Sequence, residues 1–402
     1  MSELRDNPEP LSNSHRWAIL AASTWAQASS SVAINGPAFL IPAMKQDLGL
    51  SLTTAATLAA LSIAGVLAML VIWGWLADHW GERRVLLLGI LGTLVAALVG
   101  TQARDPYLLG GSFFAMGAFG ASTSAASGRV VIGWFPPHRR GMAMGIRQMA
   151  QPLGVAIGAL TMGSIAHRWG LSVAIWVPVI ASALGLLAVL VVVIDPPRLH
   201  RSQVVSANPY RESSFLTRIH LVSALLVIPQ FVVWTFALTW LVDHRDWPID
   251  LAGTVVAGMH VLGALGRIGV GHLSDVVGSR VRPLAWVALA AAITMGLLAA
   301  LEQTPLAVLL MVVASGVTVA DNGLAFTSVA ERAGDYWAGR ALGIQNTGQY
   351  AVATASAPLA GVLITHLGYS VTFGLIALAP LLALPLIPRR DEDREPSSTG
   401  RG

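Results

Sequence analysis

The chain has 402 residues, of which 54% are hydrophobic and only 11% charged, and it contains no cysteine. So little charge does not suit a water-facing surface, and the absence of cysteine excludes disulfides, thiolate chemistry and a cysteine metal site. The formal net charge of +4 comes from basic residues that are spread over many loops instead of forming one patch, which argues against nucleic acid as a partner.

Long uncharged runs follow one another along the chain. Thirty consecutive residues between Asp47 and Asp78 carry no charge, and about 20 apolar residues are enough for a helix to cross the hydrocarbon core. These runs are continuous and do not alternate, which favours helices over the strands of an outer-membrane barrel. The sequence predicts twelve spans: Trp17–Met44, Leu52–Ala77, Val85–Gln102, Tyr107–Phe135, Gly141–Ala166, Leu171–Ile194, Ile219–Val242, Leu251–Leu273, Leu284–Leu301, Pro305–Val329, Ala341–Thr365 and Tyr369–Ile387.

The loops indicate how the chain is oriented in the bilayer. Residues 1–16 contain three acids and no apolar run, so they do not resemble a cleavable signal peptide. Of the 25 Lys and Arg residues, 18 lie in alternate connections, and the opposite connections hold only Lys45, Arg104, Arg168 and Arg245. The positive-inside rule then predicts that both termini are cytoplasmic, in a multi-pass protein of the inner or plasma membrane.

Two polar stretches repeat 197 residues apart. GWLADHWGERR begins at Gly74 and GHLSDVVGSRVR at Gly271, and a second pair, GMAMGIRQMAQ from Gly141 and GRALGIQNTGQ from Gly339, repeats with a shift of 198. Such a repeat predicts two related halves of six helices. The expected parts are an N-terminal segment (1–16), the first bundle (17–194), a cytoplasmic linker (195–217), the second bundle (218–388) and a disordered tail (389–402).

The first stretch resembles a known signature. GWLADHWGERR is similar to the loop between helices two and three of the major facilitator superfamily, G-x-L-a-D-r-x-G-r-r, although His79 and Glu82 depart from it. The resemblance implies an all-α membrane protein, with twelve transmembrane helices in two pseudo-symmetric six-helix bundles. It also implies a secondary transporter that moves a small-molecule substrate across the lipid bilayer by alternating access, without a cofactor.

This signature is expected to act as a gate. Asp78 follows a helix end, where it could face the positive N-terminus of another helix, and Gly81 permits a tight turn. In the family this contact is thought to hold the cytoplasmic gate shut; the alternative is a plain loop whose arginines set the topology. The expected gating residues are Gly74, Asp78, Gly81, Arg83, Gly271 and Asp275.

Ionisable residues within spans are costly and therefore indicate function. Arg267 stands in GRIGVGHLSD, where carriers of the monocarboxylate and oxalate–formate type place an arginine that reads a carboxylate; alternatively it extends the gate toward Asp275 or Asp78. Asp321 is the one acid deep in a span, which suggests a proton-coupling site, the alternative being a carboxyl paired with Arg267 or hydrogen-bonded to Asn322.

Other polar residues complete the predicted cavity. Arg129 and Arg147 are expected to pair with a helix C-terminus, a loop carbonyl or a lipid phosphate. Nitrate carriers of the superfamily use one arginine from span two and one from span eight. Span two has no base here, which disfavours nitrate as cargo. Asn35-Gly36-Pro37 predicts a break in span one. The predicted substrate-binding residues are Asn35, Gln151, His260, Arg267, Gln345, Asn346, Gln349 and Tyr350.

These features favour proton-coupled transport of a small organic anion such as a monocarboxylate. Efflux of lipophilic compounds by proton antiport is the alternative, and Trp25 and Trp234 favour it. Drug–proton antiporters of the superfamily usually carry an arginine in helix four and the motif G-x-x-x-G-P-x-x-G in helix five. Here Phe113 stands near the place of that arginine, and only Gln151-Pro152-Leu153-Gly154 matches the motif, which disfavours efflux. A non-transporting receptor would need a larger output domain than the linker or tail. Since no phosphate-binding loop, metal-ligand pattern or nucleophile–base pair occurs, we expect no enzyme, metal or cofactor, and no obligatory protein partner is evident.

Overall fold

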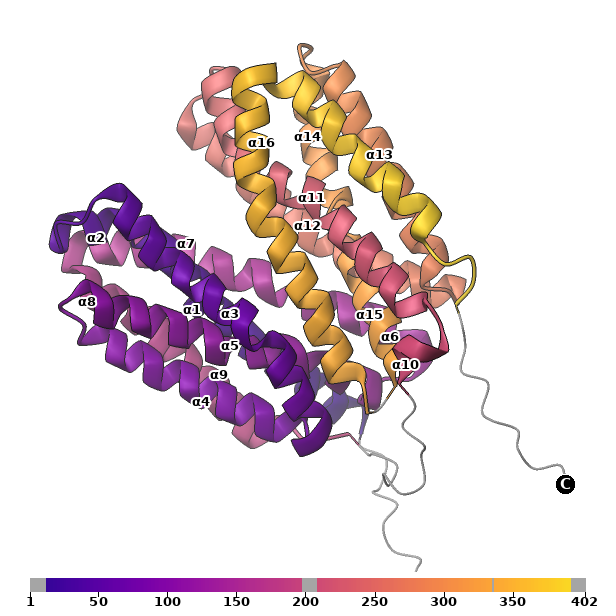
Figure 1. The fold of residues 1–402 in the computed structure, drawn as a ribbon, viewed down its shortest axis with the longest axis horizontal. Helices are drawn as coiled ribbons and strands as arrows, with labels where there is room; N and C mark the ends of the chain where they lie inside the picture. Colours follow the sequence, from indigo (N-terminus) through magenta and orange to yellow (C-terminus); the bar gives the residue numbers. More distant parts are fainter. Residues whose placement is uncertain (1–11, 197–207, 335, 392–402) are drawn as a thin grey trace, which may run out of the picture. The chain divides into compact units, whose positions relative to one another are not determined.

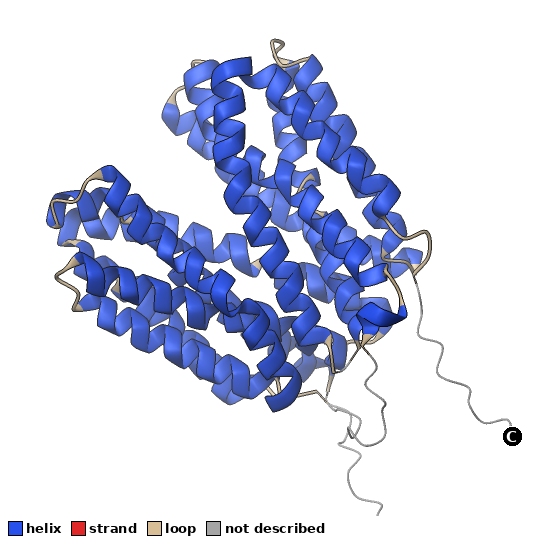
Figure 2. Cartoon of the chain, viewed as in Figure 1, coloured by secondary structure: helices blue, strands red, loops and turns tan. Residues whose placement is uncertain are grey.

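The chain folds into helices that are joined by short turns. A computed structural model describes residues 12–196, 208–334 and 336–391, and no strand occurs among them (Figure 2). A helix satisfies its own backbone N–H and C=O groups, which is what an apolar, lipid-facing segment requires. By their contacts the residues form two units, Met1–Pro136 with Leu153–Ser206, and Pro137–Pro152 with Ala207–Gly402.

The first unit is a bundle around small and apolar side chains. Where α3 crosses α1 and α5, the Ser62 hydroxyl donates to the Ile34 carbonyl and the Trp73 indole donates to the Ala118 carbonyl, each at 2.7 Å. Phe113 of α5 is completely buried in its core. Its helices are α1 (Asn13–Phe39), α2 (Ile41–Asp47), α3 (Leu52–Trp80), α4 (Glu82–Thr101), α5 (Pro106–Trp134), α8 (Leu171–Ala174), α9 (Trp176–Val192) and most of α7 (Ala150–Trp169) (Figure 1).

The second unit contains the remaining helices. In it α11 and α13 pack against α16, and α6 packs against α12 and α15. Trp240, Phe373 and Met295 are among the buried side chains of its core. Its elements are α6 (Pro137–Gln148), α10 (Pro209–Glu212), α11 (Phe215–Thr239), the π-helix η2 (Trp240–His244), α12 (Ile249–Val277), α13 (Val281–Ala300), α14 (Leu306–Val317), α15 (Asp321–Ala333), α16 (Ala338–Ala383) and η3 (Leu384–Leu386).

The predicted spans are all helical. Within the described ranges, nine helical segments are long and apolar enough to cross a membrane. One of them, Ala338–Leu386, contains two predicted spans, which the left-handed Gly368 (φ 77°) separates. The Ser- and Gly-rich helices α1 and α5 are not among the nine, yet each covers a predicted span. The prediction of an all-α chain with twelve transmembrane helices is thereby confirmed.

Three spans differ from prediction in where they break. The break predicted at Asn35-Gly36-Pro37 is wrong: α1 continues through Pro37, and the turn comes at Leu40. The span predicted as Gly141–Ala166 is instead interrupted at Met149, between α6 and α7, and the span predicted as Pro305–Val329 is interrupted between α14 and α15. Pro152 explains the interruption at Met149, because it cannot donate to the carbonyl four residues earlier, at Gln148.

The predicted linker and tail are described only in part. The described chain resumes before α10, which the Asn208 side chain caps, and α11 then begins at Phe215. Residues 197–207 of the expected linker, and most of the expected tail and of the expected N-terminal segment, lie outside the described residues.

Candidate functional site

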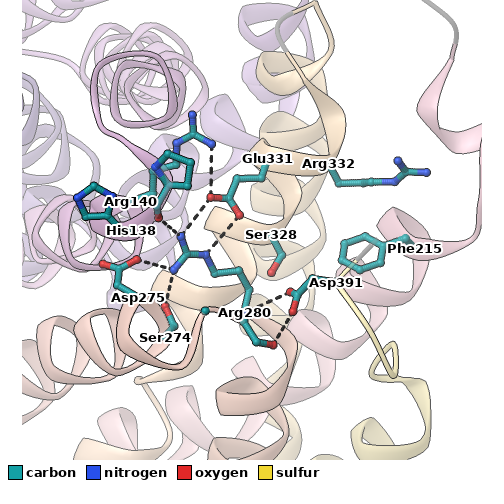
Figure 3. A pocket seen from close by; sticks show the side chains of 13 residues that line it. His138, Arg140, Phe215, Ser274, Asp275, Arg280, Ser328, Glu331, Arg332 and Asp391 are labelled. Atoms are coloured by element: carbon teal, nitrogen blue, oxygen red, sulfur yellow. Dashed lines mark hydrogen bonds and ion pairs between the residues drawn. The ribbon is translucent and has the colours of Figure 1, made fainter. Parts of the chain in front are cut away.

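The stretch from Gly271 to Arg282 forms a charged cluster in the second unit (Figure 3). Both carboxylate oxygens of Asp275 accept backbone N–H groups of α6, from Gly141 and from Met142, each at 2.9 Å. The donors lie in the second turn of α6, which begins at Pro137. Asp275 thus accepts backbone amides from a neighbouring helix.

Arg280 connects this carboxylate to two other helices. Its guanidinium donates to Asp275 Oδ1 at 2.6 Å, to the Pro137 carbonyl at 2.7 Å and to Glu331 of α15 at 3.2 Å. Burial opposes the charge, but Glu331 and Asp275 outweigh it and raise the pKa of Arg280 above its ordinary value. One permanently charged side chain therefore joins α6, α12 and α15.

A pocket of about 530 Å³ opens beside this cluster. Arg140 faces the Glu331 carboxylate at 3.6 Å, whereas Arg332 points away from Arg280 (Figure 3). Asp391 also lines the pocket and accepts the backbone N–H groups of Arg280, at 2.9 Å, and of Val281. The pocket is lined by the basic residues Arg140, Arg280 and Arg332 and by the acidic residues Asp275, Glu331 and Asp391, so the charges of its walls largely balance.

Glycines allow α6 and α12 to approach at backbone distance. A Cβ added at Gly271 would overlap the carbonyl group of Gly141, and one added at Gly145 would overlap the Arg267 backbone. Gly141 and Gly145 form a G-x-x-x-G pair, which places two small residues on one helix face. Because the helices touch here, the amides of α6 come within reach of Asp275.

The first unit holds the other copy of the signature. Asp78 is buried near the end of α3 and Gly74 is buried one turn earlier, while Gly81 ends the helix with φ 97°. The Arg83 backbone N–H donates to Asp195 Oδ1 at 2.6 Å, and its guanidinium donates to the Leu190 carbonyl at 2.9 Å. Gly278 of the second copy also has positive φ, 65°, which explains why glycine recurs at this turn.

Asp195 and Asp391 are functional candidates that the sequence analysis missed. Each carboxylate caps the N-terminus of a helix, α4 or α13, whose own first residue supplies no side-chain cap. The two aspartates lie 196 residues apart, close to the offsets of the recognised repeats. A search for further pairs at that offset could have found them.

Arg129 has a different role from the predicted one. Its Nη1 lies 2.7 Å from Glu82 Oε1, and both side chains are almost completely buried. Arg129 thus has an acidic partner that was not predicted, and the acid at position 82, which departs from the family signature, has a basic partner. Arg147 is also buried; it donates to the Gln148 side chain at 2.7 Å and lies over the Phe326 ring.

Arg267 is buried in the middle of α12, with 2% of its surface exposed. Its Nε donates to the Val319 carbonyl at 3.3 Å and its Nη1 to the Gln148 carbonyl at 2.5 Å. The guanidinium also lies 5.7 Å from the centre of the Trp234 ring. Asp275 pairs with Arg280, and no hydrogen bond or ion pair joins Asp275 to Arg267 in the described residues.

Asp321 lies at the start of α15, directly after the interruption of its span. It is 1% exposed, and neither carboxylate oxygen has a hydrogen-bond partner in the described chain. The groups that act on it are the first backbone amides of α15 and the charge of Arg267. No ion pair within 4 Å joins Asp321 to Arg267 in the described residues, although the Arg267 charge acts on the carboxyl group, and the group of Asn322 that acts on it is the backbone amide.

Gln349, one of the predicted substrate-binding residues, belongs to a network of polar side chains. The Gln349 amide donates to Asn322 at 2.9 Å and to Ser223 at 2.6 Å, and the Asn322 amide donates to Gln230 at 2.8 Å. This network connects α11, α15 and α16 through side chains alone. Asn322, Gln230 and Ser223 were not predicted as site residues, because a neutral polar residue in a span has no pattern of its own.

The other predicted substrate residues are less closely connected. Gln345 bonds to His220, which in turn bonds to Tyr210 at 2.9 Å. His260 meets the Trp234 ring edge to face, with 5.5 Å between ring centres. The amide of Asn346 bonds within its own helix, to the Leu342 carbonyl, whereas Tyr350 and Gln151 are partly buried. Asn35 belongs to the first unit, where its amide donates to the Ser31 carbonyl at 3.0 Å.

An all-helical chain of apolar spans with buried charges inside them defines a multi-pass membrane protein. The sequence profile of the Major Facilitator Superfamily matches residues 24–357. Over 387 residues, which are 95% of this chain and 87% of the relative, the chain is 44% identical to the uncharacterized MFS-type transporter Rv2994 of Mycobacterium tuberculosis. The chain belongs to the major facilitator superfamily and is a secondary transporter.

More distant relatives match only parts of the chain. It is 31% identical over 138 residues to the puromycin resistance protein pur8 of Streptomyces alboniger, covering 33% of this chain and 27% of that one. It is 27% identical over 279 residues, 60% of each chain, to the probable galactarate/D-glucarate transporter GudP of Bacillus subtilis. The solved proton:xylose symporter XylE matches 93% of this chain and 95% of its own with a TM-score of 0.74, but at 16% identity it shows the fold alone.

Proposed function

We propose that this transporter moves a small organic anion with a carboxylate group by alternating access. The observation that carries the proposal is the buried Arg267, whose hydrogen bonds go to two neutral carbonyls and to no carboxylate in the described chain. A buried cation without an acidic hydrogen-bond partner is costly. A substrate carboxylate would supply the missing negative charge, and a guanidinium can hold it through two parallel N–H bonds.

Proton coupling is assigned to Asp321. Neither of its two buried oxygens has a hydrogen-bond partner among the described residues, and the charge that acts on the carboxyl group is that of Arg267. A carboxyl group in such surroundings can exist with or without a proton, and the balance depends on whether Arg267 is neutralised by substrate. Substrate binding at Arg267 therefore favours proton uptake at Asp321, which is the linkage that symport requires.

The gate is assigned to the repeated signature. Asp275 holds the second turn of α6, Arg280 pairs with its carboxylate, and Gly271 lies against the backbone of Gly141. We assign the same role to Asp78 with Gly74, Gly81 and Arg83. In this proposal both termini are cytoplasmic, and the two six-helix bundles have the bounds predicted from the repeat, residues 17–194 and 218–388.

Uptake by purified protein in liposomes tests the cargo. We expect an inward proton gradient to drive accumulation of labelled lactate, and the Arg267→Ala variant to take up at least about 30-fold less, because loss of a buried charged contact costs about 2–5 kcal/mol. The exposed Arg139 provides a matched control: Arg139→Ala should transport like the wild type. Gradient-driven uptake that is the same with and without Arg267 would contradict the proposal.

Replacing Asp321 by Asn is expected to abolish the effect of the proton gradient on lactate uptake. The amide preserves the size of the side chain but cannot bind and release a proton. The measurement is the ratio of initial uptake rates with and without an inward gradient, which should fall to about one. Asp243→Asn, at an exposed position, should keep the wild-type ratio. Gradient-stimulated uptake by Asp321→Asn would assign coupling to another group.

Efflux of a lipophilic compound is the second candidate. It is favoured by the partial likeness to the puromycin resistance protein and by the Trp234 ring, which lies between Arg267 and His260. The same liposomes discriminate the two, if puromycin and a lipophilic cation are added to the panel. Efflux predicts movement of these compounds, with Trp234→Ala inactive and Arg267→Ala active.

A further inference from the structure

Arg267 joins two interrupted helices by their backbones. Gln148, whose carbonyl accepts from Nη1, is the last residue of α6, and Val319, whose carbonyl accepts from Nε, lies in the turn between α14 and α15. The first carbonyl is available because the residue four positions later is Pro152, which has no N–H to donate. The guanidinium therefore replaces a hydrogen bond that the chain itself cannot make.

The same helix, α12, holds α6 at two places. In the second turn of α6, Asp275 accepts the amides of Gly141 and Met142. At the end of α6, Arg267 donates to Gln148, and between the two places Gly145 lies against the backbone of Arg267. The predicted gating residue thus holds the second turn of α6, and the predicted substrate-binding residue holds its last residue.

A carboxylate competes directly with one of these ties. Bidentate binding uses two N–H groups of one guanidinium edge, and each edge shares a nitrogen with either the Val319 or the Gln148 contact. The Nη1–Nη2 edge is the tip of the side chain, farthest from α12, and its Nη1 is the nitrogen bound to Gln148. An ionised acceptor forms a stronger bond than a neutral carbonyl, so the carboxylate displaces the carbonyl.

We infer that Arg267 is a positioning residue for α6, and that a carboxylate bound at its tip releases the Gln148 carbonyl and so loosens this helix from α12. The inference rests on the proposed function, because it takes the cargo to be a carboxylate. It adds that substrate recognition and gate release use the same guanidinium. Binding at the site thereby weakens one of the two hydrogen-bonded contacts that residues of α12 make with the backbone of α6, and the contact through Asp275 remains.

The rate at which a buried thiol on α6 reacts with maleimide tests whether the hydrogen bond from Arg267 to the Gln148 carbonyl holds this helix in place. The chain has no cysteine, so Ala143→Cys, at a completely buried position of α6, introduces the single reactive group. We expect lactate to accelerate maleimide labelling of this thiol, and lactamide, which lacks the charge, to have no effect. In the absence of either compound, Arg267→Ala should label roughly tenfold or more faster than the Arg267 parent, because a hydrogen bond from a charged donor is lost, and lactate should not increase the rate further.

Two controls separate the tie from general unfolding and from charge. Ala97→Cys, which is completely buried in the core of the first unit, should label slowly with and without Arg267→Ala. Arg267→Lys keeps the charge but offers one compact donor group in place of the planar fork, so it should label at an intermediate rate and still respond to lactate.

The two proposals fail in different ways. Equal labelling of Ala143→Cys in the Arg267 and Arg267→Ala backgrounds overturns the tie, even if lactate uptake depends on Arg267. Faster labelling in Arg267→Ala, together with no response of the Arg267 parent to lactate, overturns the release by substrate. If the Arg267 parent neither responds to lactate in labelling nor takes up lactate, the proposed carboxylate cargo is wrong. If it takes up lactate without a labelling response, only the proposed release of α6 by substrate is wrong.

Discussion

Replacing Arg129 by Met is expected to lower the free energy of unfolding of the first unit by about 3–5 kcal/mol. The substitution leaves the Glu82 carboxylate, which is completely buried, without the guanidinium that lies 2.7 Å away. A buried charge that loses its partner keeps its full desolvation cost, whereas a pair shares it. The measurement is thermal or denaturant unfolding in detergent, in which the variant should also yield less monodisperse protein.

A double replacement distinguishes the loss of the ion pair from the change in side-chain shape. Glu82→Gln with Arg129→Met removes both charges and should lose less stability than the sum of the two single variants, by a coupling energy of about 0.5–3 kcal/mol. Arg139→Met, at an exposed position, should change stability by less than about 0.5 kcal/mol. A small loss in Arg129→Met, with no coupling in the double variant, would contradict a structural role for the ion pair.

Replacing Gly271 by Val is expected to reduce uptake at least about tenfold, which corresponds to about 1.4 kcal/mol. The new side chain would meet the Gly141 carbonyl group and the Met142 amide, so α6 must move away from α12. Asp275 then loses the two amides that it accepts at 2.9 Å. Uptake by liposomes and labelling of Ala143→Cys should change together, because both depend on the position of α6.

Gly269 provides a control on the same helix. A Cβ added there meets nothing within 4 Å in the described chain, although the residue lies only two positions from Gly271. Both substitutions change helix propensity equally, so Gly269→Val controls for the loss of glycine itself. Equal effects of the two variants would show that backbone approach between α6 and α12 is not what the glycine provides.

The turn that follows Asp275 could be predicted from the sequence because it is local. The Asp–Gly spacing in GHLSDVVGSR places a carboxylate near a helix end and a left-handed glycine after it, and the structure contains both, in Asp275 and Gly278. The repeat reinforced this prediction. The partner of Asp275 could be predicted only as the N-terminus of some helix, since nothing in the sequence identifies α6 as that helix.

The buried arginines show where prediction from sequence fails. Arg129 and Arg267 are equally conspicuous in the sequence, but the first meets Glu82, 47 residues away, and the second meets carbonyls 119 and 52 residues away. Pairing at such separations depends on which helices are neighbours. Hydropathy reports the affinity of a segment for lipid and contains no information on its neighbours.

The sequence by itself determined the twelve apolar spans, the duplication and the membership of the superfamily, because hydropathy and motif spacing are properties of the chain that persist in any arrangement of its helices. Only the tertiary structure decided the partners of the buried charges, the interruption of the spans at Met149 and at Thr318–Ala320, and the caps that Asp195 and Asp391 provide. A charge inside a bilayer takes whichever partner the packing of helices brings within hydrogen-bond distance. For Arg267 that partner is a carbonyl which Pro152 leaves free, and this joins the candidate substrate site to the helix that Asp275 holds.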